Sequence, residues 1–505
     1  MTLASPKALL WMNSFPKSIS ALTVSLAALA VLLVLSSSLS TIVSVSSTFQ
    51  GYFNGLYGDR EAQFGYLDKQ TVIKNDKEES HHILHRKGGS GSSNFSVTAP
   101  LGSNDRLSVT VKNENSSLGS IHGSMTSDID NTLSANEING SGYCDLYHGK
   151  WFFDPSGPLY TNNTCPIITQ MQNCQGNGRP DQEYENWRWR PNECDLPRFD
   201  GKRFLELMRG KTLAFVGDSV ARNQMESLLC ILWQVESPKN RGNRKMHRWF
   251  FESYSVMIVR IWSSWLVHQM SEAFDFAPAG VDKLHLDKPD QTFMELLPSI
   301  DVLVLSSGHW FAKQSVYILN NEIVGGQLWW PDLNRTKKIN NIEAYGISVE
   351  TSLAAIVTHP GYKGLTILRS YSPDHYEGGA WNTGGSCTGK VKPLTEGELV
   401  ENGFTQRMHE QQVMGFQRAQ KKATNKSKLR LMDITEVFSY RADGHPGPYR
   451  SLDPNKVTKR GPDGRPPPQD CLHWCMPGPV DTWNEIVLEI IRREFQQAQE
   501  LSERR

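Results

Sequence analysis

The sequence predicts an α/β domain, in which helices cover both faces of a mostly parallel β-sheet, behind a membrane anchor and a flexible segment. Three observations lead to this prediction: one long apolar run near the N-terminus, a following stretch rich in Ser, Gly and Asn, and a long remainder in which strand-like and helix-like patterns alternate. Alternating strands and helices build a parallel sheet with helices on both faces. In such sheets the chemistry takes place beyond the carboxyl ends of the strands.

Residues 20–46 form the apolar run, which contains no charged residue. A helix of roughly 20 apolar residues is long enough to cross a bilayer. Lys7 and Lys17 precede the run without any acidic residue, which places residues 1–19 in the cytosol and the rest of the chain in the lumen. The alternative is a cleaved signal peptide, but its apolar region is usually about 7–15 residues long, so an uncleaved signal anchor is favoured.

Residues 47–141 are expected to form a flexible stem, because they show little apolar periodicity and cannot bury enough surface to offset the entropy of ordering. From residue 142 onward Trp, Tyr, Phe and Cys become frequent. A folded domain is therefore placed at 142–505, with a Cys- and Trp-rich segment at 142–200 and an α/β core at 211–497. The core is expected to hold strands at 212–217, 254–267, 301–308, 365–372 and 429–434, and helices at 219–234, 347–359, 403–423 and 481–501.

The eight cysteines all follow the apolar run, on the oxidising side of the membrane, which predicts disulfide bonds but leaves their pairing open. Three residues separate the last two cysteines, and zinc binding by this pair is the weaker alternative. Six glycosylation sequons also follow the run. The cysteines are Cys144, Cys165, Cys174, Cys194, Cys230, Cys387, Cys471 and Cys475, and the sequons begin at Asn94, Asn115, Asn139, Asn162, Asn334 and Asn425.

The charge balance gives no reason to expect a nucleic-acid partner. Lys and Arg together number 53, as do Asp and Glu, so the formal net charge is zero. A neutral chain has no global field that attracts nucleic acid or an anionic membrane surface. The sequence also shows no glycine-rich loop of the kind that cradles the phosphates of a nucleotide.

The first candidate site is the segment VGDSVARNQ, in which a buried strand runs directly into a helix. Gly217 permits the tight turn, Asp218 follows it, and Ser219 then lies at the carboxyl edge of the sheet as a candidate nucleophile. Amides at the start of the helix can stabilise an oxyanion. Arg222 and Asn223, one turn later, are candidates for lining the site. The alternatives are a plain helix cap for Asp218 and Ser219 and a solvated helix face for the other two.

The second candidate site is the segment DCLHWC near the C-terminus. A serine hydroxyl needs an adjacent base to become a nucleophile. Asp470 and His473 are three residues apart, so on a turn both can point the same way. His473 is then the base, and Asp470 orients its ring and stabilises the imidazolium. Taken alone, the segment is equally consistent with a surface turn.

Five separated motifs resemble the plant trichome birefringence-like family and occur in that family's order over about residues 142–497. They are VGDSVARNQ, WRWRPNECDLPRFD, SSGHWF, SYSPDHYEGGAWNTGGSC and DCLHWCMPGPVDTWNE. An early strand–Asp–Ser–helix unit and a late Asp-x-x-His unit are the arrangement of serine hydrolases of the SGNH/GDSL type. The resemblance implies a three-layer SGNH/GDSL-like domain with disulfide-stapled loops. It also implies a single-pass type II Golgi membrane protein that acetylates wall polysaccharides in the lumen.

Carried over by motif, the resemblance makes Ser219, Asp470 and His473 the catalytic residues. In related hydrolases the oxyanion hole also uses a Gly and an Asn from later motifs. Because the SSGHW motif lacks an asparagine, the second oxyanion donor stays open. The candidates are Gly308, His309 and Asn382. Tryptophans within or beside the motifs are interpreted as a sugar-stacking groove, with the protein core as the alternative: Trp187, Trp189, Trp310, Trp381 and Trp474.

The leading functional hypothesis is acetyl transfer to a hydroxyl of hemicellulose (xyloglucan, mannan or xylan) through an acetyl-serine intermediate. No bound cofactor or metal is expected, but an acetyl donor is required, either acetyl-CoA or another acetyl carrier. The expected partners are the polysaccharide acceptor and, as a further candidate, a membrane protein that supplies the donor. One alternative is a carbohydrate esterase of the same fold. The other is a non-enzymatic binder of wall polysaccharide such as pectin, against which the intact Ser219, Asp470 and His473 argue.

Overall fold

The computed structural model describes residues 144–505 except 244–245, 332–334, 381–382, 425–427, 453–468 and 504–505. The anchor expected at 20–46 and the stem expected at 47–141 therefore lie outside the described residues. So do Trp381, Asn382 and every sequon but that of Asn162, which is partly exposed. Within the described ranges, no helix combines the length and apolar character that crossing a membrane requires.

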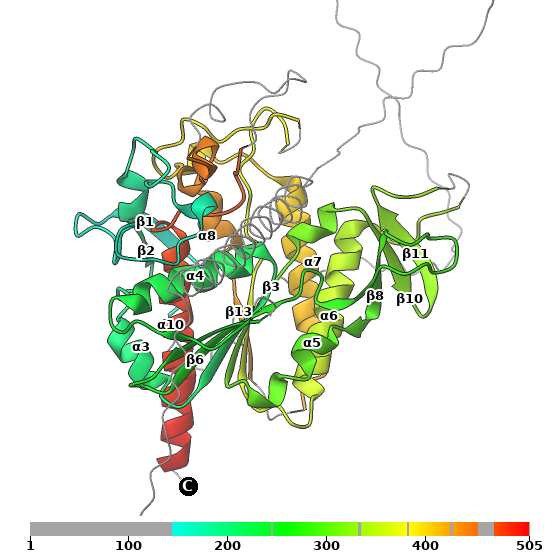
Figure 1. Cartoon of the computed structure of the whole chain (residues 1–505), viewed down its shortest axis with the longest axis horizontal. Helices are drawn as coiled ribbons and strands as arrows, with labels where there is room; N and C mark the ends of the chain where they lie inside the picture. Colours follow the sequence, from blue (N-terminus) through cyan, green and yellow to red (C-terminus); the bar gives the residue numbers. More distant parts are fainter. Residues whose placement is uncertain are drawn as a thin grey trace, which may run out of the picture. The chain divides into compact units, whose positions relative to one another are not determined.

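A seven-stranded sheet forms the centre of the domain (Figure 1). Its strand order is β13-β12-β9-β3-β6-β5-β4, and the first five of these strands are parallel. Each of the five overlaps a segment that the sequence predicts to be a strand. Antiparallel β5 and β4 complete one edge. The strands are β3 (Thr212–Gly217), β4 (Lys239–Asn240), β5 (Met246–Phe251), β6 (Val256–Trp262), β9 (Val302–Ser306), β12 (Leu365–Arg369) and β13 (Lys428–Met432).

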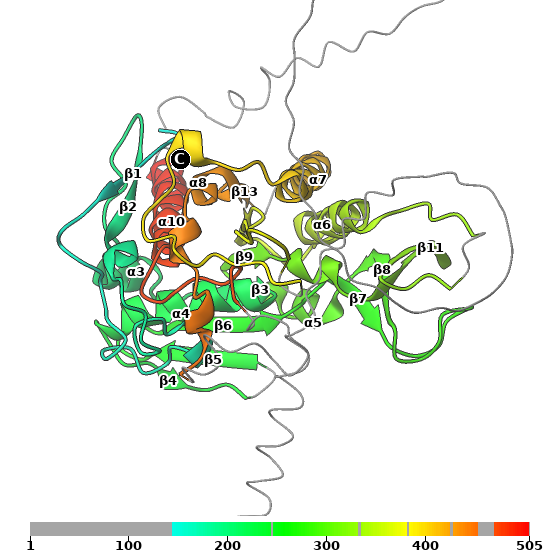
Figure 2. The same ribbon diagram turned by 90° about the horizontal axis from the view of Figure 1, so that it is seen from above.

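Both faces of this sheet are covered by helices, because alternate residues of its strands enter two separate cores. Leu213 and Phe215 of β3 pack on the side of α3 (Gly201–Leu207), α4 (Ser219–Trp233) and α10 (Val480–Glu503). Ala214 and Val216 pack on the opposite side. That side is covered by α5 (Gln291–Met294), α6 (Asn341–Thr358) and α7 (Gly403–Gln420), as Figures 1 and 2 show. The arrangement is the three-layer one expected from the sequence.

A second, four-stranded sheet was not expected from the sequence. It is mixed, with the order β11-β10-β8-β7. The strand expected at 254–267 ends at Trp262, because the chain turns at Leu266 (φ 64°) before β7 begins. The strands of the second sheet are β7 (Val267–Met270), β8 (Asp282–Pro289), β10 (Ser315–Leu319) and β11 (Glu322–Gln327).

The remaining elements are short. An antiparallel pair, β1 (Gly149–Phe153) and β2 (Trp187–Pro191), lies in the Cys- and Trp-rich segment. One further α-helix, α8 (Thr435–Ser439), follows β13. The 3-10 turns are η2 (Gln170–Gln172), η3 (Glu183–Asn186), η4 (Leu297–Ser299), η5 (His309–Ala312), η6 (Glu396–Glu398), η7 (Ala442–Gly444) and η8 (Pro448–Arg450).

All eight cysteines are paired, which confirms the expectation of disulfide bonds and supplies the connectivity that the sequence left open. Cys471 and Cys475 bond to different partners, so they do not form a pair of zinc-binding thiolates. Because these two cysteines lie two residues before and two residues after His473, the segment that carries the candidate base is held covalently on both sides. The bonds are Cys144–Cys194, Cys165–Cys230, Cys174–Cys475 and Cys387–Cys471.

Candidate active site

Ser219 is the first residue of α4 and follows directly on the carboxyl end of the central strand β3. The turn between them requires glycine, since Gly217 has φ +152° and a Cβ there would overlap the carbonyl oxygen of Ser306 on the neighbouring strand. Asp218 caps the helix by accepting a hydrogen bond from the amide of Val220 at 3.0 Å. The turn therefore places the Ser219 hydroxyl at the helix N-terminus, where the helix dipole favours negative charge.

Asp470 and His473 lie side by side in a buried turn. The Nδ1 of His473 is 3.0 Å from Oδ2 of Asp470, and the other carboxylate oxygen accepts the amide of His473 at 2.9 Å. Burial would raise the pKa of Asp470, but the His473 imidazole and these hydrogen bonds hold it far below its usual range. Because Asp470 stays ionised, Nδ1 of His473 carries a proton and Nε2 is the nitrogen that can act as a base.

The side chain of Asn223 joins the two halves of the candidate site. Its Nδ2 donates to the carbonyl oxygen of Trp474 at 3.2 Å, and its Oδ1 accepts the Trp474 amide at 2.7 Å. Asn223 lies one turn after Ser219 on α4, and Trp474 directly follows His473. The sequence placed Asn223 among the residues that line the substrate site. The structure instead gives its amide a positioning role, because the main chain of Trp474 occupies both of its polar atoms.

Asp218, the residue before the candidate nucleophile Ser219, forms a buried pair with His309. Nδ1 of His309 is 3.5 Å from Oδ2 of Asp218, and its Nε2 donates to the carbonyl oxygen of Ser372 at 2.9 Å. Burial raises the pKa of Asp218, but His309 and then Arg369 shift it below its ordinary value. The His309 ring also stacks on Tyr371. These contacts occupy the buried His309 ring, so only the main chain of His309 stays a candidate for binding an oxyanion.

Gly308 lies at the turn between β9 and η5, and β9 pairs with β3, the strand that precedes Ser219. It has φ +135°, and a Cβ there would lie 2.8 Å from the ring of Tyr371. The close packing explains why the position is glycine, and Gly308 keeps its place as a candidate oxyanion residue. The other candidate, Asn382, lies outside the described residues.

A buried charged group that interacts electrostatically with His473 was not predicted from the sequence. Glu226, one turn beyond Arg222 on α4, is buried, and its Oε1 lies 4.0 Å from Nε of Arg222. Burial raises the pKa of Glu226, while Arg222, Arg260 and a protonated His473 act to lower it. Arg222 is therefore part of a charged cluster rather than of a solvated helix face. The i,i+4 spacing of Arg222 and Glu226 was the signal in the sequence.

The tryptophans divide between the core and the surface. Trp189 and Trp474 are buried and belong to the core, as the alternative interpretation held, whereas Trp187 and Trp310 are partly exposed. Trp310 packs edge-on against Trp262, with ring centroids 5.7 Å apart. Trp262 lies beside Gly217 in the sheet, so this pair is at the same strand edge as the turn that carries Ser219.

Comparison with known families decides the family. Residues 196–490 match the model of "PC-Esterase: GDSL/SGNH-like Acyl-Esterase family found in Pmr5 and Cas1p", and residues 142–195 match the "PMR5 N terminal Domain". The chain belongs to the PC-esterase family. The turn that carries Ser219 and the Asp-x-x-His segment both fall within the first match, and Cys174 of the second match forms a disulfide with Cys475 of the first.

Named relatives of this PC-esterase come from plants. Protein YLS7 of Arabidopsis thaliana is 58% identical over 98% of each chain. Protein trichome birefringence-like 18 of the same organism is 72% identical over 70% of this chain and 66% of its own length. Xyloglucan O-acetyltransferase 1 of Arabidopsis thaliana is 39% identical over 71% of this chain and 83% of its own length. The resemblance to the trichome birefringence-like family is thereby confirmed.

Proposed function

We propose that this PC-esterase is an O-acetyltransferase that adds acetyl groups to hydroxyls of a plant cell-wall polysaccharide. The observation that carries the proposal is the contact between Asp470 and Nδ1 of His473, in a segment that Asn223 and two disulfides hold against the helix that begins at Ser219. A nucleophile, a base and a group that orients the base are the parts that acyl transfer requires. The names of relatives that act on xyloglucan support a hemicellulose as the acceptor.

The proposed reaction has two balanced steps. His473 Nε2 takes the proton of Ser219 as its oxygen attacks the acetyl carbonyl, and the donor leaves with that proton, so that Ser219 carries the acetyl group. His473 then takes the proton of a sugar hydroxyl, whose oxygen attacks the acetyl-serine, and returns it to the departing Ser219 oxygen. Asp470 stabilises the imidazolium in both steps, and amides at the start of α4 together with Gly308 stabilise the oxyanion.

The proposed location is the Golgi lumen, with residues 20–46 as a signal anchor and 47–141 as a glycosylated stem that gives the domain reach. Four disulfides support an oxidising compartment. The partners are a polysaccharide acceptor (xyloglucan, mannan or xylan) and an acetyl donor, which is acetyl-CoA or another carrier. A membrane protein that delivers the donor fits this arrangement.

The deciding experiment incubates the purified full-length protein with an acetyl donor and a panel of xyloglucan, mannan and xylan oligosaccharides. Mass spectrometry should show products heavier by one acetyl group with at least one acceptor, and none with Ser219→Ala. Release of acetate at the same rate with and without every acceptor indicates an esterase instead. Binding of the oligosaccharides without either product indicates a non-enzymatic polysaccharide binder.

A further inference from the structure

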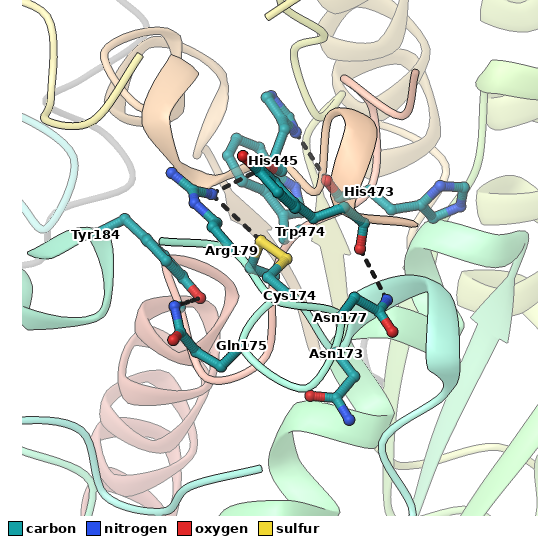
Figure 3. The surroundings of a disulfide bond; sticks show 12 residues. Asn173, Cys174, Gln175, Asn177, Arg179, Tyr184, His445, His473 and Trp474 are labelled. Carbon is teal, nitrogen blue, oxygen red and sulfur yellow. Dashed lines mark hydrogen bonds between the residues drawn. A yellow bond between two sulfur atoms is a disulfide. The ribbon is translucent and has the colours of Figure 1, made fainter. Parts of the chain in front are cut away.

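Two histidines outside the proposed triad form a chain of contacts that ends on the main chain of His473. Nδ1 of His445 lies 2.7 Å from the carbonyl oxygen of His473, and Nε2 of His445 lies 2.7 Å from Nδ1 of His375. At the other end, Nε2 of His375 lies 2.9 Å from the carbonyl oxygen of Ser439. Figure 3 shows His445 beside Trp474, with the His473 imidazole pointing away from it. The chain thus reaches the candidate base through its main chain.

The number of protons on the pair restricts its arrangement. A carbonyl oxygen only accepts, so each outer contact needs an N–H, and the central contact between two nitrogens needs a third proton. Two neutral imidazoles carry two protons between them. Burial lowers the pKa of His375 to about 4 and that of His445 well below its ordinary value, so both are neutral near pH 7. One of the three contacts therefore lacks a proton.

Burial indicates which contact lacks the proton. The contact between His445 and His473 is buried, whereas the contact between His375 and Ser439 is only partly buried, so water is closer to that second contact. The missing proton costs least at that partly buried end. His375 Nδ1 then donates to His445 Nε2, which leaves the proton of His445 on Nδ1, and this nitrogen donates to the carbonyl oxygen of His473. The contact to His473 is also the shorter of the two outer ones.

We propose that His445, held in its Nδ1-protonated tautomer by His375, is a positioning residue for His473. The inference rests on the proposed acetyl transfer. His445 binds the carbonyl of His473 on one side while Asn223 binds the next residue from α4. Losing the first contact lets the base shift relative to Ser219, and a misplacement of about 1 Å costs on the order of 100-fold in rate.

Several charged or titratable groups surround the pair and shape its response to pH. Arg179 donates to the main-chain oxygen of His445 at 3.0 Å, and the ring of His445 stacks on Trp474 with centroids 4.1 Å apart. The Arg179 contact is to the main chain and does not depend on the side chain at position 445, whereas the stacking contact is lost equally in both variants compared. The titratable groups that act on the pair are Glu377, Lys390, Asp443, Asp470 and His473.

Two substitutions of nearly equal shape test the proposal in the full-length protein. In His445→Asn the side-chain amide places an N–H near the position of Nδ1, whereas in His445→Asp an ionised carboxylate places only oxygen there. With p-nitrophenyl acetate as the acyl donor, the Asn variant should keep kcat within about threefold of wild type. The Asp variant should lose at least about tenfold in kcat, and KM should be unchanged in both. Lowering the pH should raise the kcat of the Asp variant relative to that of wild type, because a protonated carboxyl can donate a hydrogen bond to the carbonyl oxygen of His473.

Equal losses in the two variants, with no recovery of the Asp variant at low pH, overturn the positioning role. The tautomer itself is measured without activity, from the ¹⁵N shifts of histidine-labelled full-length protein, with the His445 signals assigned by their loss in His445→Asn. A protonated Nδ1 on His445 supports the proposal, and a protonated Nε2 overturns it. A wild type that shows the expected tautomer but forms no acetyl-enzyme refutes the proposed function instead.

Discussion

Replacing Asn223 by alanine should separate the two halves of the candidate site without removing any catalytic group. The substitution deletes the hydrogen bonds at 2.7 and 3.2 Å to the main chain of Trp474. Trp474 is fully buried, so bulk solvent does not reach its freed main-chain groups. An unsatisfied buried group costs roughly 1–3 kcal/mol, so the two together should lower the free energy of unfolding by roughly 2–6 kcal/mol. The Cys174–Cys475 bond keeps the segment attached.

The loss of activity in Asn223→Ala should exceed what lower stability explains. With its neighbour released, His473 no longer has a fixed position relative to Ser219, and kcat should fall on the order of 100-fold. Denaturant unfolding gives the stability change, and acetyl transfer at a temperature where every variant is folded gives kcat.

A second buried asparagine, which joins α10 to α4, provides a matched control. Asn484 on α10 is also buried and donates to Gln224 and Ser227 of α4, at 3.3 and 2.9 Å, without touching the segment of His473. Asn484→Ala should lose similar stability but keep kcat within about threefold. If Asn223→Ala behaves like this control, the hydrogen bonds between Asn223 and Trp474 support only the fold, and the reasoning about positioning is wrong.

Three further predictions concern the base, the disulfide and the dependence of stability on pH. Ser219→Ala and His473→Ala should each abolish transfer, and the double variant should be little worse than either, because the residues act as one unit; additive losses argue against a triad. Replacing Cys174 and Cys475 together by serine should cost roughly 2–5 kcal/mol in denaturant unfolding and also reduce kcat; unchanged kcat means that the bond does not help to hold the base. Burial lowers the pKa of His375 to about 4, below its value in the unfolded chain. Between about pH 6.5 and 4 the unfolded chain therefore binds more protons than the folded one, and the free energy of unfolding should decrease as the pH is lowered through this range. His375→Asn should reduce that slope in thermal unfolding, and an unchanged slope assigns the pH dependence to other groups.

The parallel sheet and its helices could be predicted because their patterns are local. The strand at 212–217 coincides with β3, and the helix expected at 481–501 differs from α10 by one or two residues at each end. The second sheet lacks such signals. Strand β8 contains buried Lys283 and His285, which break the apolar pattern, and β11 contains two adjacent glycines. Its strands owe their place to tertiary packing rather than to propensity.

The candidate catalytic residues could be named from sequence because their types and local spacing reflect their chemistry. The residues that position them could not, since each acts on a partner far along the chain. Asn223 and Trp474 are 251 residues apart, and His445 and His473 are 28 apart. A single sequence contains no record of such pairs. Asn223 stands in the mostly polar stretch SVARNQMES, so its neighbours did not mark it as a buried amide that needs a partner.

The support of His473 explains why the Cys- and Trp-rich segment and the α/β core belong to one functional unit. The turn that carries the base belongs to no helix or strand, yet a general base must be held within about 0.5 Å of its working position. Four separate parts of the chain supply that rigidity, through two disulfides, the Asn223 amide and the His445 imidazole. The N-terminal segment contributes one of these bonds through Cys174. Its Arg179 also donates to the main-chain oxygens on both sides of Gly444, at 2.7 and 3.0 Å, and so fixes the loop from which His445 projects. The segment matched by the PMR5 N-terminal domain is therefore part of the scaffold of the proposed base, and the core alone lacks the Cys174–Cys475 bond and the Arg179 contacts.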